Sequence, residues 1–465
     1  MRPALLITLC TGMFLVQLDV TVVNVALPTL GAQLHAGLTA LQWVVDGYSV
    51  VLAALLLAGG ALGDVLGHRR VVLTGLVVFG TASAACGFAQ SASWLIAARA
   101  GQGVGAALLL PGTLAVINRS CPDPSSRARA LGVWAGVSAL ALPAGPLLGG
   151  VLVSLAGWRP VFLLNVPIVV AAALAVRTLV EPGSRRAGRV DVPGAATAAL
   201  ALGAGVYAVI GHRPVAAVIA VAAAAAFLVV EHRSADPMLP LALLKSRRTA
   251  GATIISAAMN FVGLGTVLVF TLYLQSVLHL TPLDAGLAML PLFLPLVLLG
   301  PLSGRLTAKL GPRPSIIAGL LLGALGLAGL LRVDPTTSYP TLLPALLGLG
   351  AGMGLLTAAV VTAAVTDAPP DRAGVAGGIN NAARQAAGAL GVAVFGAVEG
   401  DPANHPAFVH GLHTLGVTAA ALWLASAALA AVTTGPRATG ANGADWPLRA
   451  RGTLRRSATR GGRVR

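Results

Sequence analysis

The sequence contains fourteen apolar runs, most of them near 20 residues long, and only 10% of its 465 residues are charged. A helix of about 20 apolar residues crosses the roughly 30 Å hydrocarbon core of a bilayer. Soluble domains carry about 25% charged residues, far more than this chain. The runs lack the alternation of apolar and polar residues that is typical of barrel strands. The sequence therefore predicts an all-α polytopic membrane protein.

The expected spans are separated by charged residues, proline or glycine. Their approximate limits are 4–28, 41–62, 71–90, 94–118, 128–153, 161–180, 192–210, 214–230, 249–275, 282–304, 313–332, 340–366, 374–398 and 411–433. An even number of spans puts both termini on one side of the membrane.

The distribution of positive charge predicts which side that is. All but five of the 31 lysines and arginines fall in segments on the side of the termini; the exceptions are Arg99, Arg159, Arg213, Arg332 and Arg384. Because cytoplasmic loops carry an excess of Lys and Arg, we expect both termini in the cytoplasm and the chain in the plasma membrane. The tail, 435–465, has eight arginines and one acid and is expected to be disordered, with an affinity for anionic lipid. No fold or aromatic platform accompanies these arginines, so nucleic acid is not an expected partner.

Two sequence patterns recur at nearly the same offset. "GALGDVLGHRR" (60–70) resembles "GRLTAKLGPRP" (304–314), and "GQGVGAALL" from Gly101 resembles "GLGAGMGLL" from Gly348. Such recurrence predicts two parallel six-helix halves, 1–180 and 249–434, with two extra helices in 181–248 between them.

An ionisable residue lies deep in the first span. Asp19 is about 15 residues into the run, which corresponds to ~22 Å along a helix. An intramembrane acid marks a functional site by default. Burial favours its protonated form and a nearby arginine favours its carboxylate, so Asp19 is suited to carry a proton. A static structural ion pair is the alternative.

Two further charged residues fall within the same half. Arg99, about five residues into the fourth span, needs an anion or water as partner because guanidinium stays charged. We expect it to pair with Asp19 when Asp19 is ionised and to be released when Asp19 is protonated. Asp46, beside Trp43 and Tyr48, is either a second protonatable group or a residue facing outer water.

These motifs together resemble the major facilitator superfamily, specifically its fourteen-span drug:proton antiporter branch and, within it, exporters of the methylenomycin-resistance type. The resemblance covers residues 4–433. It rests on "LDVTVVNVALP" in the first span, "WVVDGY" in the second, the 60–70 loop, "RAGQGVGAA" in the fourth span, "GPLLGG" in the fifth and "NAARQ" in the thirteenth. It implies that Arg99 couples proton movement to substrate release.

The resemblance also assigns roles to two backbone motifs. It implies an inner-gate latch formed by Gly60, Asp64, Gly67, Arg69 and Arg70. In the second half Ala308 stands where the first has Asp64, so the charged latch is expected in the first half alone. In the fifth span, an antiporter hinge is expected at Gly145, Pro146, Gly149 and Gly150, although close helix packing explains the glycines equally well.

Other polar residues within spans are candidates for lining a substrate cavity. They are Gln17, Asn24, Tyr48, Asn260, Tyr273, Asn381, Arg384 and Gln385. For any one of these, a hydrogen bond between helices is the alternative.

The sequence favours a secondary transporter over an enzyme. Lys245 and Lys309 are the only lysines and neither lies in a phosphate-binding loop, so the chain is not expected to hydrolyse ATP. No cofactor is expected. His405, His410 and His413 lack a completing acid or cysteine pattern, so no metal is expected either. We expect proton-coupled export of small lipophilic compounds by a monomer, conferring drug resistance; proton-coupled symport or facilitated diffusion of a small metabolite is the alternative.

Overall fold

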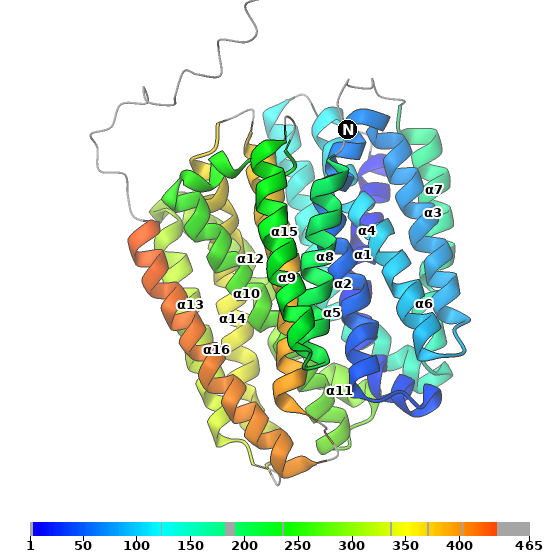
Figure 1. The fold of residues 1–465 in the computed structure, drawn as a ribbon, viewed down its shortest axis with the longest axis vertical. Coiled ribbons are helices and arrows are strands. Elements are labelled where there is room, and N and C mark those ends of the chain that lie inside the picture. Colours follow the sequence, from blue (N-terminus) through cyan, green and yellow to red (C-terminus); the bar gives the residue numbers. More distant parts are fainter. Residues whose placement is uncertain are drawn as a thin grey trace, which may run out of the picture. The chain divides into compact units, whose positions relative to one another are not determined.

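The computed structural model describes residues 3–121, 123–181, 191–234, 237–334, 337–369, 372–400, 402 and 404–434, which lie in one compact unit. The tail from 435, with its predicted lipid affinity, lies outside the described residues. Within the described ranges the chain is helical and has no strand (Figure 1).

Sixteen α-helices form the described part of the chain. They are α1 (Pro3–Leu34), α2 (Leu38–Leu66), α3 (His68–Gly87), α4 (Ala92–Ser120), α5 (Pro124–Ala156), α6 (Arg159–Leu163), α7 (Asn165–Leu179), α8 (Val192–Ile210), α9 (Pro214–Arg233), α10 (Arg247–Leu272), α11 (Pro282–Ala288), α12 (Leu290–Leu310), α13 (Pro312–Ala328), α14 (Leu343–Thr366), α15 (Ala373–Glu399) and α16 (His405–Thr433).

Local sequence signals explain where several helices begin. The Ser91 hydroxyl accepts a hydrogen bond from the Trp94 N–H at the start of α4, and Asp123 accepts one from the Ser126 N–H at the start of α5. Such side chains satisfy amide groups that have no partner within the helix. Asp123 also accepts a hydrogen bond from the Ser125 hydroxyl, and these bonds lower the pKa of this exposed carboxyl group.

Thirteen helical segments of the described chain are long and apolar enough to cross a membrane. Short helices merge into five of them: α6 with α7, α10 with the π-helical turn Tyr273–Val277, α11 with α12, α13 with the 3-10 helix Gly329–Arg332, and α14 with the 3-10 helix Tyr339–Leu342. Helix α15 is a fourteenth candidate, with 27 residues. Its polar residues, among them Arg384, lower its mean hydropathy. The predicted all-α membrane fold is thereby confirmed.

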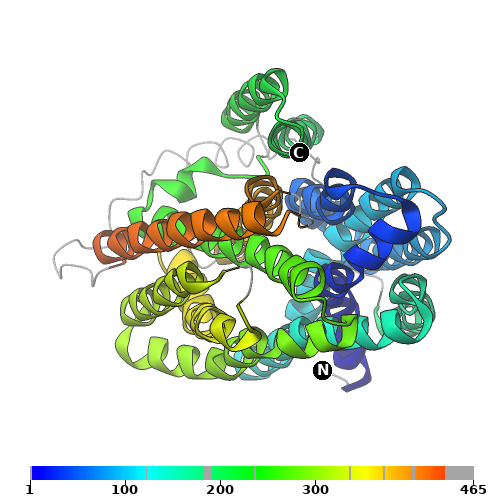
Figure 2. The ribbon, with the colours of Figure 1, turned by 90° about the horizontal axis from the view of Figure 1, so that it is seen from below.

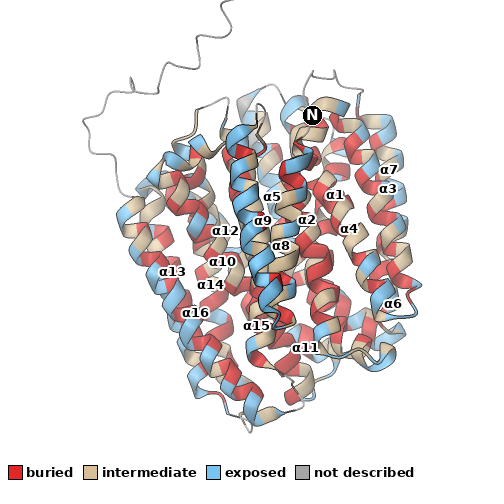
Figure 3. Ribbon diagram, viewed as in Figure 1, coloured by how far each residue is buried: buried red, intermediate tan, exposed pale blue. Residues whose placement is uncertain are grey.

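Helices α8 and α9 pack on each other, and α8 also contacts α2 and α15. In Figure 2 they form a separate green pair beside the other helices, and in Figure 3 much of α9 is exposed. In each, only 17% of the most apolar window is buried within the protein. This exposure suits two helices that face lipid.

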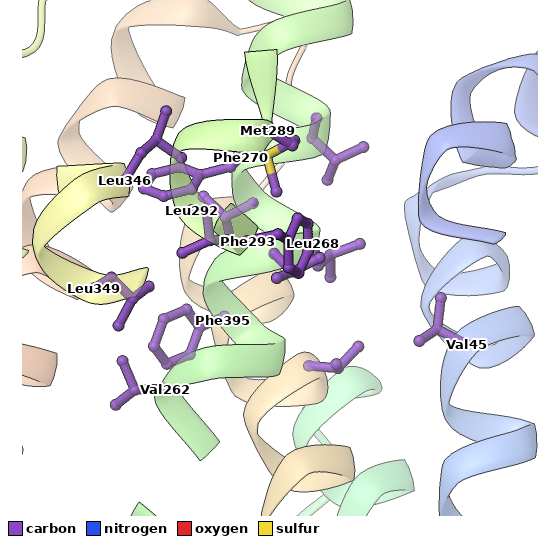
Figure 4. Packing of buried hydrophobic residues seen from close by; sticks show 14 of the residues in the cluster. Val45, Val262, Leu268, Phe270, Met289, Leu292, Phe293, Leu346, Leu349 and Phe395 are labelled. Atoms are coloured by element: carbon purple, nitrogen blue, oxygen red, sulfur yellow. The ribbon is translucent and has the colours of Figure 1, made fainter. Parts of the chain in front are cut away.

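The buried cores are apolar and built by several helices each. One cluster joins residues of α1 to α5 and α7, including Leu15, Leu76 and Phe79. A larger cluster includes Phe270, Leu292 and Leu346 of α10, α12 and α14, which point toward one another in Figure 4.

At the end of the bundle away from the start of α1, hereafter the distal end, α1 and α5 contact residues of the 275–286 segment. The Gln275 side chain donates a hydrogen bond to the Val25 carbonyl oxygen at 3.0 Å. A methyl group on Gly150 would lie 2.8 Å from the Pro282 oxygen, and one on Gly286 would overlap the Pro146 carbonyl group. Glycine at these positions therefore lets α5 and α11 approach backbone to backbone.

Candidate functional site

Asp19 and Arg99 form an ion pair between the middle of α1 and the first third of α4. Their side chains are 0% and 1% exposed, so the pair is shielded from water. Arg99 also donates from Nε to the Val44 carbonyl oxygen at 2.9 Å and from Nη1 to Gln102 Oε1 at 2.8 Å. The guanidinium thus has three oxygen acceptors, which a buried charge of this kind needs.

Neutral side chains complete the shell around the Asp19 carboxylate. Gln102 Nε2 donates to Asp19 Oδ1 at 3.1 Å and to Ser83 Oγ at 2.7 Å. Asn165 Nδ2 lies 3.3 Å from the same two atoms. Cys86 Sγ is 3.3 Å from Gln102 Oε1. The carboxylate therefore has donors from α4 and α7 as well as its ionic partner.

The sequence prediction missed Ser83, Cys86, Gln102 and Asn165. Gln102 lies inside the fourth-span motif and is one turn from Arg99, so its helix position could have suggested it. Ser83 and Asn165 carry no comparable signal, because single small polar residues occur in many membrane helices.

Aromatic rings cover the guanidinium. The Arg99 Cζ atom lies 4.4 Å from the Tyr48 ring centroid and 5.9 Å from that of Phe162. Cation–π contacts of this kind are worth ~2 kcal/mol when desolvated. Tyr48 is fully buried and its hydroxyl donates to the Val16 carbonyl oxygen at 3.2 Å. Tyr48 thus belongs to the ion-pair site and, in this structure, makes the hydrogen bond between helices that was the alternative to lining a cavity.

Asp46 is also completely buried, so it does not face water in this structure. Neither carboxylate oxygen has a hydrogen-bond partner within the described part of the chain. An isolated buried carboxylate is costly when ionised. This environment suits a protonated acid.

In the 60–70 motif only Gly67, with φ +92°, lies between helices, since α2 continues to Leu66 and α3 begins at His68. Its charged residues do not meet, however. Asp64 is 62% exposed and contacts His68 Nε2 at 3.5 Å, whereas Arg69 donates to the Arg177 carbonyl oxygen. Asp64 forms no ion pair with Arg69 or Arg70 among the described residues.

The fifth-span motif lies where α5 crosses α1 and α11. A methyl group on Gly145 would overlap Thr21, and one on Gly149 would lie 3.0 Å from the Val22 oxygen. Pro146 lies within α5. Together with Gly150, these residues build a close contact between helices, which either a hinge or simple packing requires.

Helices α10 and α15 carry a second polar group. Asn380 Nδ2 donates to Ser256 Oγ at 2.9 Å. One turn further, the Arg384 guanidinium donates to Asn260 Oδ1 from Nε and Nη2 at 3.5 and 3.4 Å. Arg384 and its neighbours Asn381 and Gln385 are half-buried, whereas Asn260 is buried.

The remaining cavity candidates have different environments. Gln17 is half-buried. Asn24 is buried and donates to the Val20 carbonyl oxygen at 3.0 Å within its own helix. Tyr273 is fully buried, stacks on Phe408 with 6.4 Å between ring centroids, and donates to the Asp334 carbonyl oxygen at 3.4 Å. Tyr273 therefore packs in the core instead of lining a cavity.

The sequence prediction also missed Glu399, near the distal end. It is 2% exposed, and both of its carboxylate oxygens lack a hydrogen-bond partner among the described residues. The Gln42 amide lies against Gly396, one turn earlier on α15. Glu399 lay outside our predicted sites because it falls at the end of an apolar run, where acids are common.

An open surface pocket of about 760 Å³ lies between α8 and α9, with the exposed side chains of Leu200, Tyr207 and Ile219 in its wall. Within the described ranges, no cluster of three or more His, Cys, Asp or Glu residues is placed to hold a metal ion.

Comparison with known proteins identifies one family of membrane transporters. The Major Facilitator Superfamily profile matches residues 9–392. The methylenomycin A resistance protein of Streptomyces coelicolor is 38% identical over 342 residues, covering 71% of each chain. The puromycin resistance protein pur8 of Streptomyces alboniger is 35% identical, covering 84% of this chain and 81% of that relative. The multidrug resistance protein Stp of Mycobacterium tuberculosis is 36% identical, covering 71% and 64%.

Solved structures show the same fold. A bacterial homologue of the human lysosomal transporter Spinster, in an inward-facing and unoccupied conformation, aligns with a TM-score of 0.67. The alignment covers 93% of this chain and 98% of the other at 18% identity. The likeness at this identity concerns the fold alone.

Proposed function

The chain belongs to the major facilitator superfamily and is a membrane transporter, and from this premise we propose that it exports small lipophilic compounds in exchange for protons. The proposal rests on the Asp19–Arg99 ion pair, which is buried and shielded from water. Relatives named for resistance to methylenomycin A, puromycin and several drugs support export and drug resistance as the outcome.

The proposed coupling step is an exchange of partners at Asp19. The structure has Asp19 and Arg99 in contact, which corresponds to the ionised carboxylate. Protonation removes the negative charge and leaves Arg99 with the Val44 and Gln102 oxygens alone. Because a buried cation without an anion is unfavourable, protonation drives a rearrangement of α4 relative to α1. Substrate binding that favours the paired state then expels the proton.

We propose that this movement opens and closes the two ends of the bundle alternately. The distal end is closed by α5 against α11 and by Gln275 against α1. These contacts support a conformation that opens at the other end, where α1 begins.

The charge distribution supports placing that end in the cytoplasm. We therefore propose a plasma-membrane monomer with both termini inside. Two six-helix halves, 1–180 and 249–434, would move against each other, with 181–248 at their side.

The proposal is tested in inverted vesicles that contain the purified protein or Asp19→Asn. A proton gradient is imposed, and its dissipation is followed on addition of methylenomycin A, puromycin and lipophilic dyes. We expect dissipation with the wild type and none with Asp19→Asn. Uptake of a compound by the wild type without proton movement would favour facilitated diffusion, and proton movement in the same direction as the compound would favour symport.

A further inference from the structure

Helix α15 brings one permanent positive charge to the middle of the bundle. Arg384 is eleven residues from the start of α15 and fifteen from its end, so it lies about 17 Å along the helix. Arginine stays protonated in proteins, and a charged residue at this depth faces a partner or a water-filled space.

The contacts of Arg384 are weaker than those of Arg99. Arg99 has a carboxylate and two further oxygens as partners, at 2.9 Å or less. Arg384 has a single neutral acceptor, Asn260 Oδ1, at distances near the upper limit for a hydrogen bond. Across the described ranges it forms no ion pair.

Among the described residues of 249–434, the acids lie away from this level. Asp284 and Asp334 lie near the distal end, on α11 and after α13. Asp367 pairs with Arg248 at 3.3 Å, where α10 begins. Glu399 is fifteen residues further along α15, or ~22 Å.

Arg384 lies in a stretch of α15 that is partly exposed. Every residue from 381 to 387 is half-buried, whereas 388 and 389 are buried. Seven consecutive residues cover all faces of a helix, so α15 is partly accessible on each face at this level. Asn381 and Gln385 lie within one turn of Arg384 and add amide groups beside alanines that offer an apolar surface.

From this juxtaposition we propose that Arg384, positioned by Asn260, binds an acidic group of the transported compound, so that the substrates are lipophilic acids bearing a carboxylate. The inference rests on the proposed function, because it names the substrate class of the proposed exporter. A guanidinium binds a carboxylate through two parallel hydrogen bonds. The carboxylate of the bound compound would supply the negative charge that Arg384 lacks. Arg99 cannot serve in this way while Asp19 occupies it.

Equilibrium dialysis of the purified full chain in detergent tests the proposal with two probes of equal shape, 2-naphthoate and its neutral amide, 2-naphthamide. Uptake by empty micelles is subtracted. We expect the wild type to bind the carboxylate about tenfold more tightly than the amide, or better. Arg384→Gln should bind both equally, and Arg384→Lys should keep part of the preference.

Arg332→Gln is the matched control, since Arg332 is exposed beyond α13 and should not affect the preference. Equal binding of both probes by the wild type, no binding of 2-naphthoate, or an unchanged preference in Arg384→Gln would overturn the proposal. The wild-type comparison stands even if Arg384→Gln does not fold. The dialysis measures binding alone and does not depend on proton transport. A carboxylate preference in dialysis together with no proton movement in the vesicle assay would refute the proposed coupling and leave this inference intact.

Discussion

The Asp19–Arg99 pair makes the stability of the N-terminal helices depend on charge balance. Asp19→Ala leaves Arg99 buried without an anion. We expect this change to lower the free energy of unfolding by roughly 3–5 kcal/mol. Unfolding in a denaturing detergent, followed by circular dichroism, measures the difference.

Two comparison variants give this prediction its control. The double variant Asp19→Ala with Arg99→Met should recover part of the loss, because neither charge then remains. Asp64→Ala removes an exposed acid and should change stability by less than about 1 kcal/mol. A double variant less stable than Asp19→Ala would contradict the assigned charge balance.

At this scale the sequence could indicate the charged residues and, by its spacing from Arg99, Gln102, but not the other neutral partners. Asp19 and Arg99 stand out because ionisable residues are rare in apolar runs. The shell of Ser83, Gln102 and Asn165 depends on which faces of α3, α4 and α7 meet. Likewise, Tyr48 is polar at its tip, and only packing determined that its ring would cover Arg99.

The crossing of α5 over α1 and α11 depends on glycine at defined positions. A methyl group on Gly150 would lie 2.8 Å from both the Leu283 Cα and the Pro282 oxygen, while one on Gly136, also on α5, would meet nothing within 4 Å. We expect Gly150→Ala to open the distal end and Gly136→Ala to leave it closed. Labelling of a cysteine placed at Ala285, which is 1% exposed on α11, by a membrane-impermeant maleimide reports the opening.

The three native cysteines are buried and should contribute little background to that labelling. Equal labelling in the Gly150→Ala and Gly136→Ala variants would show that close approach at Gly150 does not hold this end shut. The sequence predicted a special role for the glycines of α5. It did not predict that Gly286 of α11 would meet Pro146, because that contact joins distant parts of the chain.

For the whole molecule, the order of the spans was predictable and their mutual packing was not. Apolar length located helices such as α8 and α9 from the sequence, because crossing a bilayer requires about 20 apolar residues. The contact between helices at the distal end depends on long-range pairs such as Gln275 with Val25. No local pattern encodes such a contact.

Orientation is tested by reporters fused to the full chain. A reporter that folds only in the cytoplasm should be active when it is fused to the end of the chain. A reporter that folds only outside the cytoplasm should be active when it is inserted after His212, between α8 and α9. Cytoplasmic activity at both sites would contradict the span order, and the reversed pattern would contradict the predicted orientation.

The central claim is that substrate binding and protonation of Asp19 exclude each other. It is tested most directly by adding methylenomycin A, puromycin and lipophilic dyes one at a time to the purified protein in weakly buffered detergent and following released protons with a pH indicator. The account predicts proton release by the wild type with at least one compound that binds, and none by Asp19→Asn with the same compound. Binding without proton release by the wild type, or equal release by Asp19→Asn, would contradict it.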